Sequence, residues 1–279
     1  MSLEIIWFVL SFCILVLASI FDLKTREVPD YLSYSFIISA LGISLLYSLY
    51  TKNIFFFLYS CIGAIIIFSL GYILYRAKQI GGADIKILTA LGAIFANYSL
   101  GNIPLLFLFI ILLIIIGSIY TLTWGVVLYI NSWKRANKKA KELLIEKKNL
   151  RVVLTIFVLF IFITTFFTPN ENIKILLVAI ALLSIFTFYL LIFIRVIESI
   201  HFIVKLHVEK LTEGDWLAKE VKVNGKIICS TKAPCLDKKQ IDAIKRAKPD
   251  FVFIKVGIPF VPAILLATVV AFILLFRVF

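Results

Sequence analysis

The stretch Ile80–Lys86, with the sequence IGGADIK, decides how this chain is read, because it places an isolated acid between apolar blocks. Between Asp30 and Glu142 the only acidic residue is Asp84. The segments around it are apolar enough to lie in a bilayer, where an ionisable side chain is costly and is by default a candidate functional residue. A second carboxylate, Asp22, occupies a matching place at the end of the first apolar run. Two such acids mark places where membrane helices meet water.

The composition predicts a membrane protein. The 279 residues are 62% hydrophobic and 16% charged, whereas soluble domains are about 45–50% apolar and about 25% charged. Eight apolar runs reach or approach the roughly 20 residues that a membrane helix needs: 3–21, 31–50, 54–75, 84–100, 103–130, 152–168, 173–194 and 258–276. We therefore predict an all-α polytopic membrane protein with six to eight transmembrane helices, eight preferred, and a small α+β cytoplasmic domain.

The loop charges predict the orientation. Loops rich in Lys and Arg (22–30, 76–83, 131–151) alternate with loops that hold a single Lys between them (51–53, 97–102, 169–172). Because cytoplasmic loops carry the excess of basic residues, this alternation predicts a multi-pass plasma-membrane protein with its N-terminus outside. Asp22 and Asp84 then fall on the same, cytoplasmic, side. The net charge of +13 is explained by these loops, so it gives no reason to expect nucleic-acid binding.

The expected domains follow from these spans: a catalytic membrane core at 1–130 that holds both aspartates, a basic cytoplasmic loop with two further spans at 131–195, a small cytoplasmic α+β domain at 196–256, and a C-terminal span at 257–279. Within the α+β domain, Asn224-Gly225 predicts a hairpin turn. Asp237–Ala247 predicts a helix capped by Asp237, and Phe251–Val256 predicts a strand.

Several hydrolytic chemistries are disfavoured by what the sequence lacks. There is no HExxH motif, and the two histidines, His201 and His207, lie outside every expected span. We therefore expect no metal site and no cofactor. The four cysteines show no CxxC spacing and predict no disulfide framework.

Paired carboxylates remain as the candidate chemistry. Aspartyl proteolysis needs two acids that share one proton, one ionised to activate water and one protonated to polarise the scissile carbonyl. Taken alone, Asp84 could instead be an interfacial acid or a helix cap, and Asp22 could simply end a span. Because both aspartates are isolated acids and are expected on the same side of the membrane, together they favour a functional role.

The residues around both acids resemble a known family. Gly81-Gly82-Ala83-Asp84 matches the G-x-hydrophobic-Asp motif of GxGD-type membrane aspartyl proteases. The segment from Asp22 to Asp30, DLKTREVPD, is similar to the first-aspartate region of the type IV prepilin peptidases and their archaeal preflagellin relatives. A looser similarity covers LTEGDWL at 211–217 and GIPFVP at 257–262, which points to the archaeal preflagellin branch.

This resemblance implies an endopeptidase that removes short basic leader peptides from preflagellin (archaellin) or type IV prepilin-like precursors at the cytoplasmic membrane face. It implies Asp22 and Asp84 as catalytic residues, with precursor proteins and membrane lipids as partners. The oligomeric state stays open. The tetracysteine site of the bacterial enzymes is missing, so we expect no N-methyltransferase activity. The archaeal relatives typically have about six spans, so eight suggest an inserted helical pair at 152–194.

The neighbouring residues suggest supporting roles. Gly81 and Gly82 can adopt positive φ and allow a tight entry into the fourth span, with Ala83 completing the motif. Pro29 favours an extended residue before it and fixes the return into the second span. Lys86 is expected to face lipid headgroups. Since Asp84 begins a helix and Asp22 ends one, helix polarity predicts Asp84 as the base and Asp22 as the acid.

Two other functions stay open. A transporter or channel could use Asp84 in a proton or cation relay, which predicts polar residues along the fourth and neighbouring spans. Alternatively, the protein could be a membrane scaffold whose basic segment 134–151 binds anionic lipid or an assembly partner, although a topology-setting anchor explains that segment equally simply.

Overall fold

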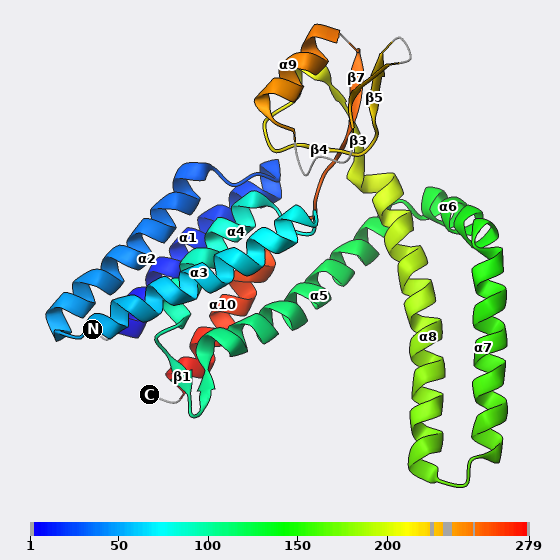
Figure 1. The fold of residues 1–279 in the computed structure, drawn as a ribbon, viewed down its shortest axis with the longest axis horizontal. Coiled ribbons are helices and arrows are strands. Elements are labelled where there is room, and N and C mark those ends of the chain that lie inside the picture. The colour runs from blue at the N-terminus through cyan, green and yellow to red at the C-terminus, as the bar shows by residue number, and fades with distance from the viewer. Residues whose placement is uncertain (1–2, 224–225, 231–235, 248, 278–279) are drawn as a thin grey trace. The chain divides into compact units, whose positions relative to one another are not determined.

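The computed structural model describes residues 3–223, 226–230, 236–247 and 249–277 (Figure 1). The chain divides into two compact units, of which the first combines Met1–Thr123 with Lys205–Phe279 and the second is Trp124–Val204. Six helices among the described residues are long and apolar enough to cross a membrane. The chain is therefore a multi-pass, mostly helical membrane protein with small strand-containing segments, as the composition predicts.

The helical part of the first unit consists of α1 (Leu3–Thr25), α2 (Asp30–Thr51), α3 (Ile54–Arg76), α4 (Gly82–Phe95), the first part of α5 (Leu105–Asn131) and α10 (Val261–Phe276). Between α4 and α5, β1 (Ser99–Leu100) pairs antiparallel with β2 (Ile103–Pro104). Two of the eight expected spans are short. The 14 residues of α4 and the 16 of α10 rise about 21 and 24 Å, less than the roughly 30 Å of hydrocarbon.

α4 lies between α2 and α3 in the core of this unit (Figure 1). Glycines make this burial possible, because Gly63 of α3 and Gly92 of α4 face each other with no side chain between them. A Cβ at Gly92 would lie 2.7 Å from the carbonyl oxygen of Gly63. At the C-terminal end, the Asn97 amide donates to Ser60 Oγ (2.6 Å), which itself donates to Ser44 Oγ (2.8 Å). These contacts fix the position of α4, and with it the residues at its N-terminus.

α10 packs along α1, although the two helices stand at opposite ends of the chain (Figure 1). The ring of Phe8 contacts Phe272 and Phe276 edge-on, with centroids 5.5 and 5.8 Å apart. Buried Ala263, Ala267 and Ala271 recur every four residues along α10, so one face of this helix can approach a neighbour closely. The fold thus brings the last helix beside the first.

The strand-containing segment has a core of its own. In this segment β3 (Ile203–His207), β7 (Phe251–Lys255) and β4 (Trp216–Leu217) form one sheet in the order β3-β7-β4, β5 (Val221–Val223) pairs antiparallel with β6 (Lys226–Cys229), and α9 is Lys238–Ala247. The predicted Asn224-Gly225 turn lies outside the described residues, but the strands on both sides pair as a hairpin. Asp237 caps α9 as predicted, because its Oδ1 accepts the Gln240 N–H at 2.7 Å.

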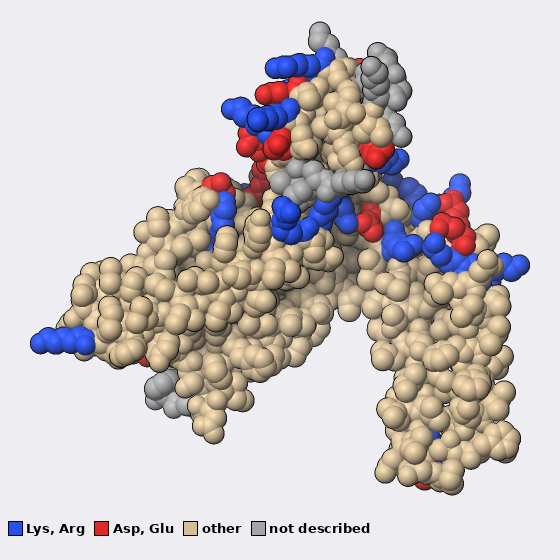
Figure 2. All heavy atoms as spheres, viewed as in Figure 1, with Lys and Arg blue, Asp and Glu red and all other residues tan. Residues whose placement is uncertain are grey.

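The second unit contains α6 (Trp133–Glu146), α7 (Lys148–Phe167) and α8 (Glu171–Ile197), and α8 continues into the π-helical turn Glu198–Phe202. The basic loop expected at 131–151 is therefore mostly helical, which corrects that expectation. Its apolar residues Ala136 and Leu143 are buried with Phe188 and Ile192 of α8, because the amphipathic pattern of α6 gives it one face to bury. Figure 2 shows charged side chains gathered at the α6 end of the α7–α8 hairpin and mostly uncharged residues along the rest of it.

Candidate active site

Asp22 lies in the last turn of α1 and is only 7% exposed. It shares a buried helix face with Leu15 and Ala18, at the spacing that places residues on one side of a helix. Its Oδ2 accepts a hydrogen bond from the backbone N–H of Val261 at 2.9 Å. A buried carboxylate needs such donors, and this one comes from the first residue of α10.

Asp84 is the third residue of α4 and is half-buried. Its Oδ2 accepts a hydrogen bond from the Gly81 N–H at 3.2 Å, in the manner of a capping box. The approach of α3 to α4 fixes this end of the helix as well, because a Cβ at Gly71 would lie 2.9 Å from the side chain of Ile85. The helix-cap role that the sequence left open for Asp84 is thus present, but it engages only one carboxylate oxygen.

The two aspartates come from different helices and are 62 positions apart in the sequence, but their carboxyl groups are close enough to interact electrostatically. The core of this unit borders the site, since Ala18 of α1 is buried in it and Ile80 and Ala83 pack against it. The arrangement therefore offers two carboxylates beside an apolar interior.

The four supporting residues occupy the places the sequence suggests, with one physical correction. Gly81 has φ of −74° and is the N-cap residue of α4, and Gly82 does not have positive φ either. Positive φ was therefore the wrong reason for these glycines. Pro29 stands immediately before α2, where its carbonyl oxygen accepts the Leu32 N–H at 3.0 Å.

Lys86 differs from its predicted place at the lipid headgroups. Its Nζ lies 2.6 Å from Asp30 Oδ1 and 4.4 Å from the centre of the Tyr34 ring, so it joins α4 to the start of α2. As expected, it is not the partner of either site aspartate. Spacing along the chain could not reveal this pair, because Lys86 and Asp30 are 56 positions apart on two different helices.

The structure removes the reason for predicting Asp84 as the base and Asp22 as the acid. That prediction relied on Asp22 lying at a helix C-terminus and Asp84 at an N-terminus. In the structure, the Asp22 carboxylate also faces an N-terminus, that of α10. Helix polarity no longer distinguishes the two carboxyl groups, so which one acts as base stays undecided by this reasoning.

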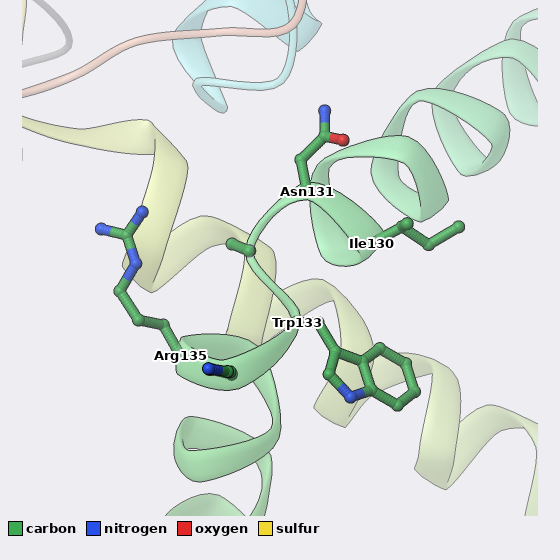
Figure 3. Close-up of a pocket in the computed structure, with 6 residues that line it drawn as sticks. Ile130, Asn131, Trp133 and Arg135 are labelled. Atoms are coloured by element: carbon green, nitrogen blue, oxygen red, sulfur yellow. The ribbon is translucent and has the colours of Figure 1, made fainter.

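Neither histidine lies beside the aspartates. His201 Nε2 is 3.0 Å from Ser132 Oγ, and the His207 ring packs edge-on against Phe251. Among the described residues, no three His, Cys, Asp or Glu side chains are grouped so that they could hold a metal ion. A shallow pocket at the turn between α5 and α6 is lined by residues 130–135, and there the Trp133 and Arg135 side chains point in different directions (Figure 3). It contains neither aspartate.

Comparison with known proteins assigns the N-terminal region. Residues 9–122, which contain Asp22 and Asp84, match the profile of the type IV leader peptidase family. This stretch is therefore similar to that family. It is a family of aspartic-type endopeptidases. Residues 9–122 are called the leader peptidase region below, and they contain the two aspartates that the sequence motif singled out.

Two relatives support this assignment. The leader peptidase region is 34% identical over 86 residues to a preflagellin peptidase of Methanocaldococcus jannaschii, covering 31% of this chain and 36% of the relative. It is 38% identical over 85 residues to a preflagellin peptidase of Methanococcus voltae, covering 30% of this chain and 36% of that relative. The chain thus spans about a third of the length of these curated relatives. No solved structure is significantly similar to it.

Proposed function

We propose that this protein is a membrane aspartyl endopeptidase that removes short basic leader peptides from preflagellin or type IV prepilin-like precursors. The observation that carries the proposal is the pair Asp22 and Asp84, which come from separate helices, lie inside the matched residues 9–122 and are close enough to interact electrostatically. The family supplies the reaction, because its members act on precursor proteins. The names of the two relatives suggest preflagellin as the precursor.

The proposed mechanism uses the two carboxyl groups in different protonation states. Two carboxyl groups near each other in an apolar setting disfavour double ionisation, so the pair holds one shared proton. The ionised member takes a proton from a water molecule as that water attacks the scissile carbonyl carbon. The protonated member donates a hydrogen bond to the carbonyl oxygen, and the peptide bond then breaks as a proton passes to the leaving nitrogen. This chemistry uses no metal or organic cofactor, and we expect no methyl transfer.

The surroundings of α4 support a peptidase over a relay. The buried residues of α4 after Asp84 are apolar apart from Thr89, whose hydroxyl donates to the Ile85 carbonyl oxygen at 2.7 Å within the same helix. A proton or cation pathway would continue as polar groups along the helix. The buried residues of α4 after Asp84 do not supply such a continuous series of polar groups.

The test is cleavage of a preflagellin precursor by membranes that contain the protein. Asp22→Asn and Asp84→Asn each remove an ionisable group with little change in shape, so each should abolish cleavage while leaving expression and thermal stability in detergent near normal. Asp242→Asn makes the same change at an exposed acid on α9 and should cleave normally. Undiminished cleavage by either site variant would remove the proposed mechanism.

The same assay tests the proposed orientation. The basic loops predict that both aspartates lie on the cytoplasmic side and that the N-terminus lies outside. Sealed vesicles with the cytoplasmic face outward should therefore cut added precursor, whereas right-side-out vesicles should cut it only after detergent permeabilisation. Cleavage in the reverse pattern would contradict the orientation without touching the chemistry.

A further inference from the structure

The site contains a contribution from the far end of the chain. The Val261 N–H, which donates to Asp22 Oδ2 at 2.9 Å, lies 239 positions after Asp22 in a buried environment. The Phe260 N–H is directed at the same carboxyl group. Both residues lie outside the matched region 9–122. A residue that we place in the reaction is therefore held by a helix that the family comparison does not cover.

Packing fixes the position of these two amide groups. α10 packs against α1, and Val261 itself is fully buried. The Phe260 ring rests against α5 at Gly117, where a Cβ would lie 2.9 Å from the ring. The start of α10 is thus held from two sides, which leaves its amide groups little freedom relative to Asp22.

The two carboxyl groups are held in the same way. Asp84 Oδ2 accepts from the Gly81 N–H at the start of α4, and Asp22 Oδ2 accepts from the Val261 N–H at the start of α10. In each case the Oδ2 atom accepts a hydrogen bond from a backbone N–H at the start of a helix. Catalytic groups act efficiently when they are oriented before the reaction begins.

We propose that the Phe260–Val261 segment is a positioning element of the active site, whose backbone amides hold the Asp22 carboxylate in its reactive orientation. The functional centre then consists of α1, α4 and the start of α10. The catalytic part of this inference rests on the proposed function, whereas the hydrogen bond itself does not. The competing explanation is that Asp22 merely caps α10, in which case the bond would stabilise the helix without affecting the chemical step.

Hydrogen exchange tests the bond independently of activity. A peptide covering 257–263 reports chiefly on the amides of Phe260, Val261 and Ala263, because Pro259 and Pro262 have none. In the full-length protein in detergent, Asp22→Ala should accelerate exchange in this peptide at least tenfold, while Asp84→Ala should leave it unchanged. Exchange that is the same in the Asp22→Ala and unaltered proteins would overturn the proposal.

Enzyme kinetics test the consequence. Val261→Pro removes the N–H, and proline is well tolerated at the first position of a helix. We expect kcat to fall about tenfold or more, which corresponds to one hydrogen bond to a charged group, with little change in KM. Val261→Ala keeps the N–H and should lose much less. Lys148→Pro, at the first position of α7, is the matched proline control and should cleave normally.

The outcomes separate this inference from the proposed function. Normal kcat in the Val261→Pro protein, or equal losses in the Val261→Pro and Lys148→Pro proteins, would overturn the positioning role and leave the aspartyl mechanism standing. If the unaltered protein cuts no precursor, the proposed function fails and the catalytic part of the inference fails with it. Hydrogen exchange would then still decide whether α10 holds Asp22.

Discussion

At the scale of single residues, the glycine that matters most is Gly81, and the reason is space. The Asp84 carboxylate lies over its backbone, so an added Cβ would be 3.2 Å from Asp84 Oδ2. The neighbouring Gly82 has more room, because a Cβ there would make an ordinary contact of 3.8 Å with the Tyr75 ring. Since neither residue has positive φ, alanine brings no backbone strain at either position. Comparing alanine at Gly81 with alanine at Gly82 therefore separates crowding of Asp84 from the other effects of replacing a glycine.

We therefore predict different outcomes for the two alanine variants. Gly81→Ala should displace the Asp84 carboxylate by a few tenths of an ångström and lower kcat about tenfold or more, as small misplacements of reacting groups do. Gly82→Ala should change kcat by about twofold or less. The measurement is the cleavage rate of a precursor at saturating concentration, with thermal unfolding recorded for both proteins. Equal losses in the two variants would show that crowding of Asp84 is not the cause.

At the scale of secondary-structure elements, the contact of α3 with α4 sets where Asp84 stands. Gly92→Ala would place a Cβ 2.7 Å from a backbone oxygen of α3, and a backbone cannot move aside as a side chain can. We predict that this variant separates the helices, lowers the unfolding temperature by several degrees and reduces cleavage together with stability.

The matched control is Gly42→Ala in α2, where an added Cβ meets nothing within 4 Å. Alanine is a better helix former than glycine by about 1 kcal/mol, so this variant should be as stable as the unaltered protein or slightly more so. Thermal unfolding in detergent measures both effects. Equal destabilisation by the two alanines would mean that glycine flexibility, and not close packing, matters at Gly92.

The helices and strands also show which features of the fold could be predicted from the sequence and which could not. Apolar length predicted the long helices, and the Asp237 cap and the strands around it were predicted from local patterns that the structure confirms. The end of α4 at Phe95 was not predictable, because apolar residues continue beyond it and the hydrogen bond of Asn97 to another helix marks the end. The contact of Asp22 with α10 was equally hidden, since no local pattern relates residues 239 positions apart.

At the scale of the whole molecule, the second unit contributes no residue to the proposed chemistry. It contains none of the residues that we place in the site, and it lies beyond the leader peptidase region. The residues that flank 133–200 lie close together, because Ser132 Oγ and His201 Nε2 are 3.0 Å apart. A segment whose ends lie side by side can be removed with a short linker, so the expected insertion of a helical pair can be tested.

This closeness of the ends allows a sharp test. Replacing residues 133–200 by a Gly/Ser linker of about six residues, which can span up to about 20 Å, removes α6, α7, α8 and the start of the π-helical turn that follows α8. Because two expected spans are lost together, the strand-containing segment and α10 keep their sides of the membrane. We predict that the shortened protein still cuts precursor in detergent, and that adding Asp84→Asn to it abolishes the cleavage. A shortened protein that keeps the hydrogen-exchange pattern of α1–α4 but cuts nothing would show that the second unit takes part in the reaction.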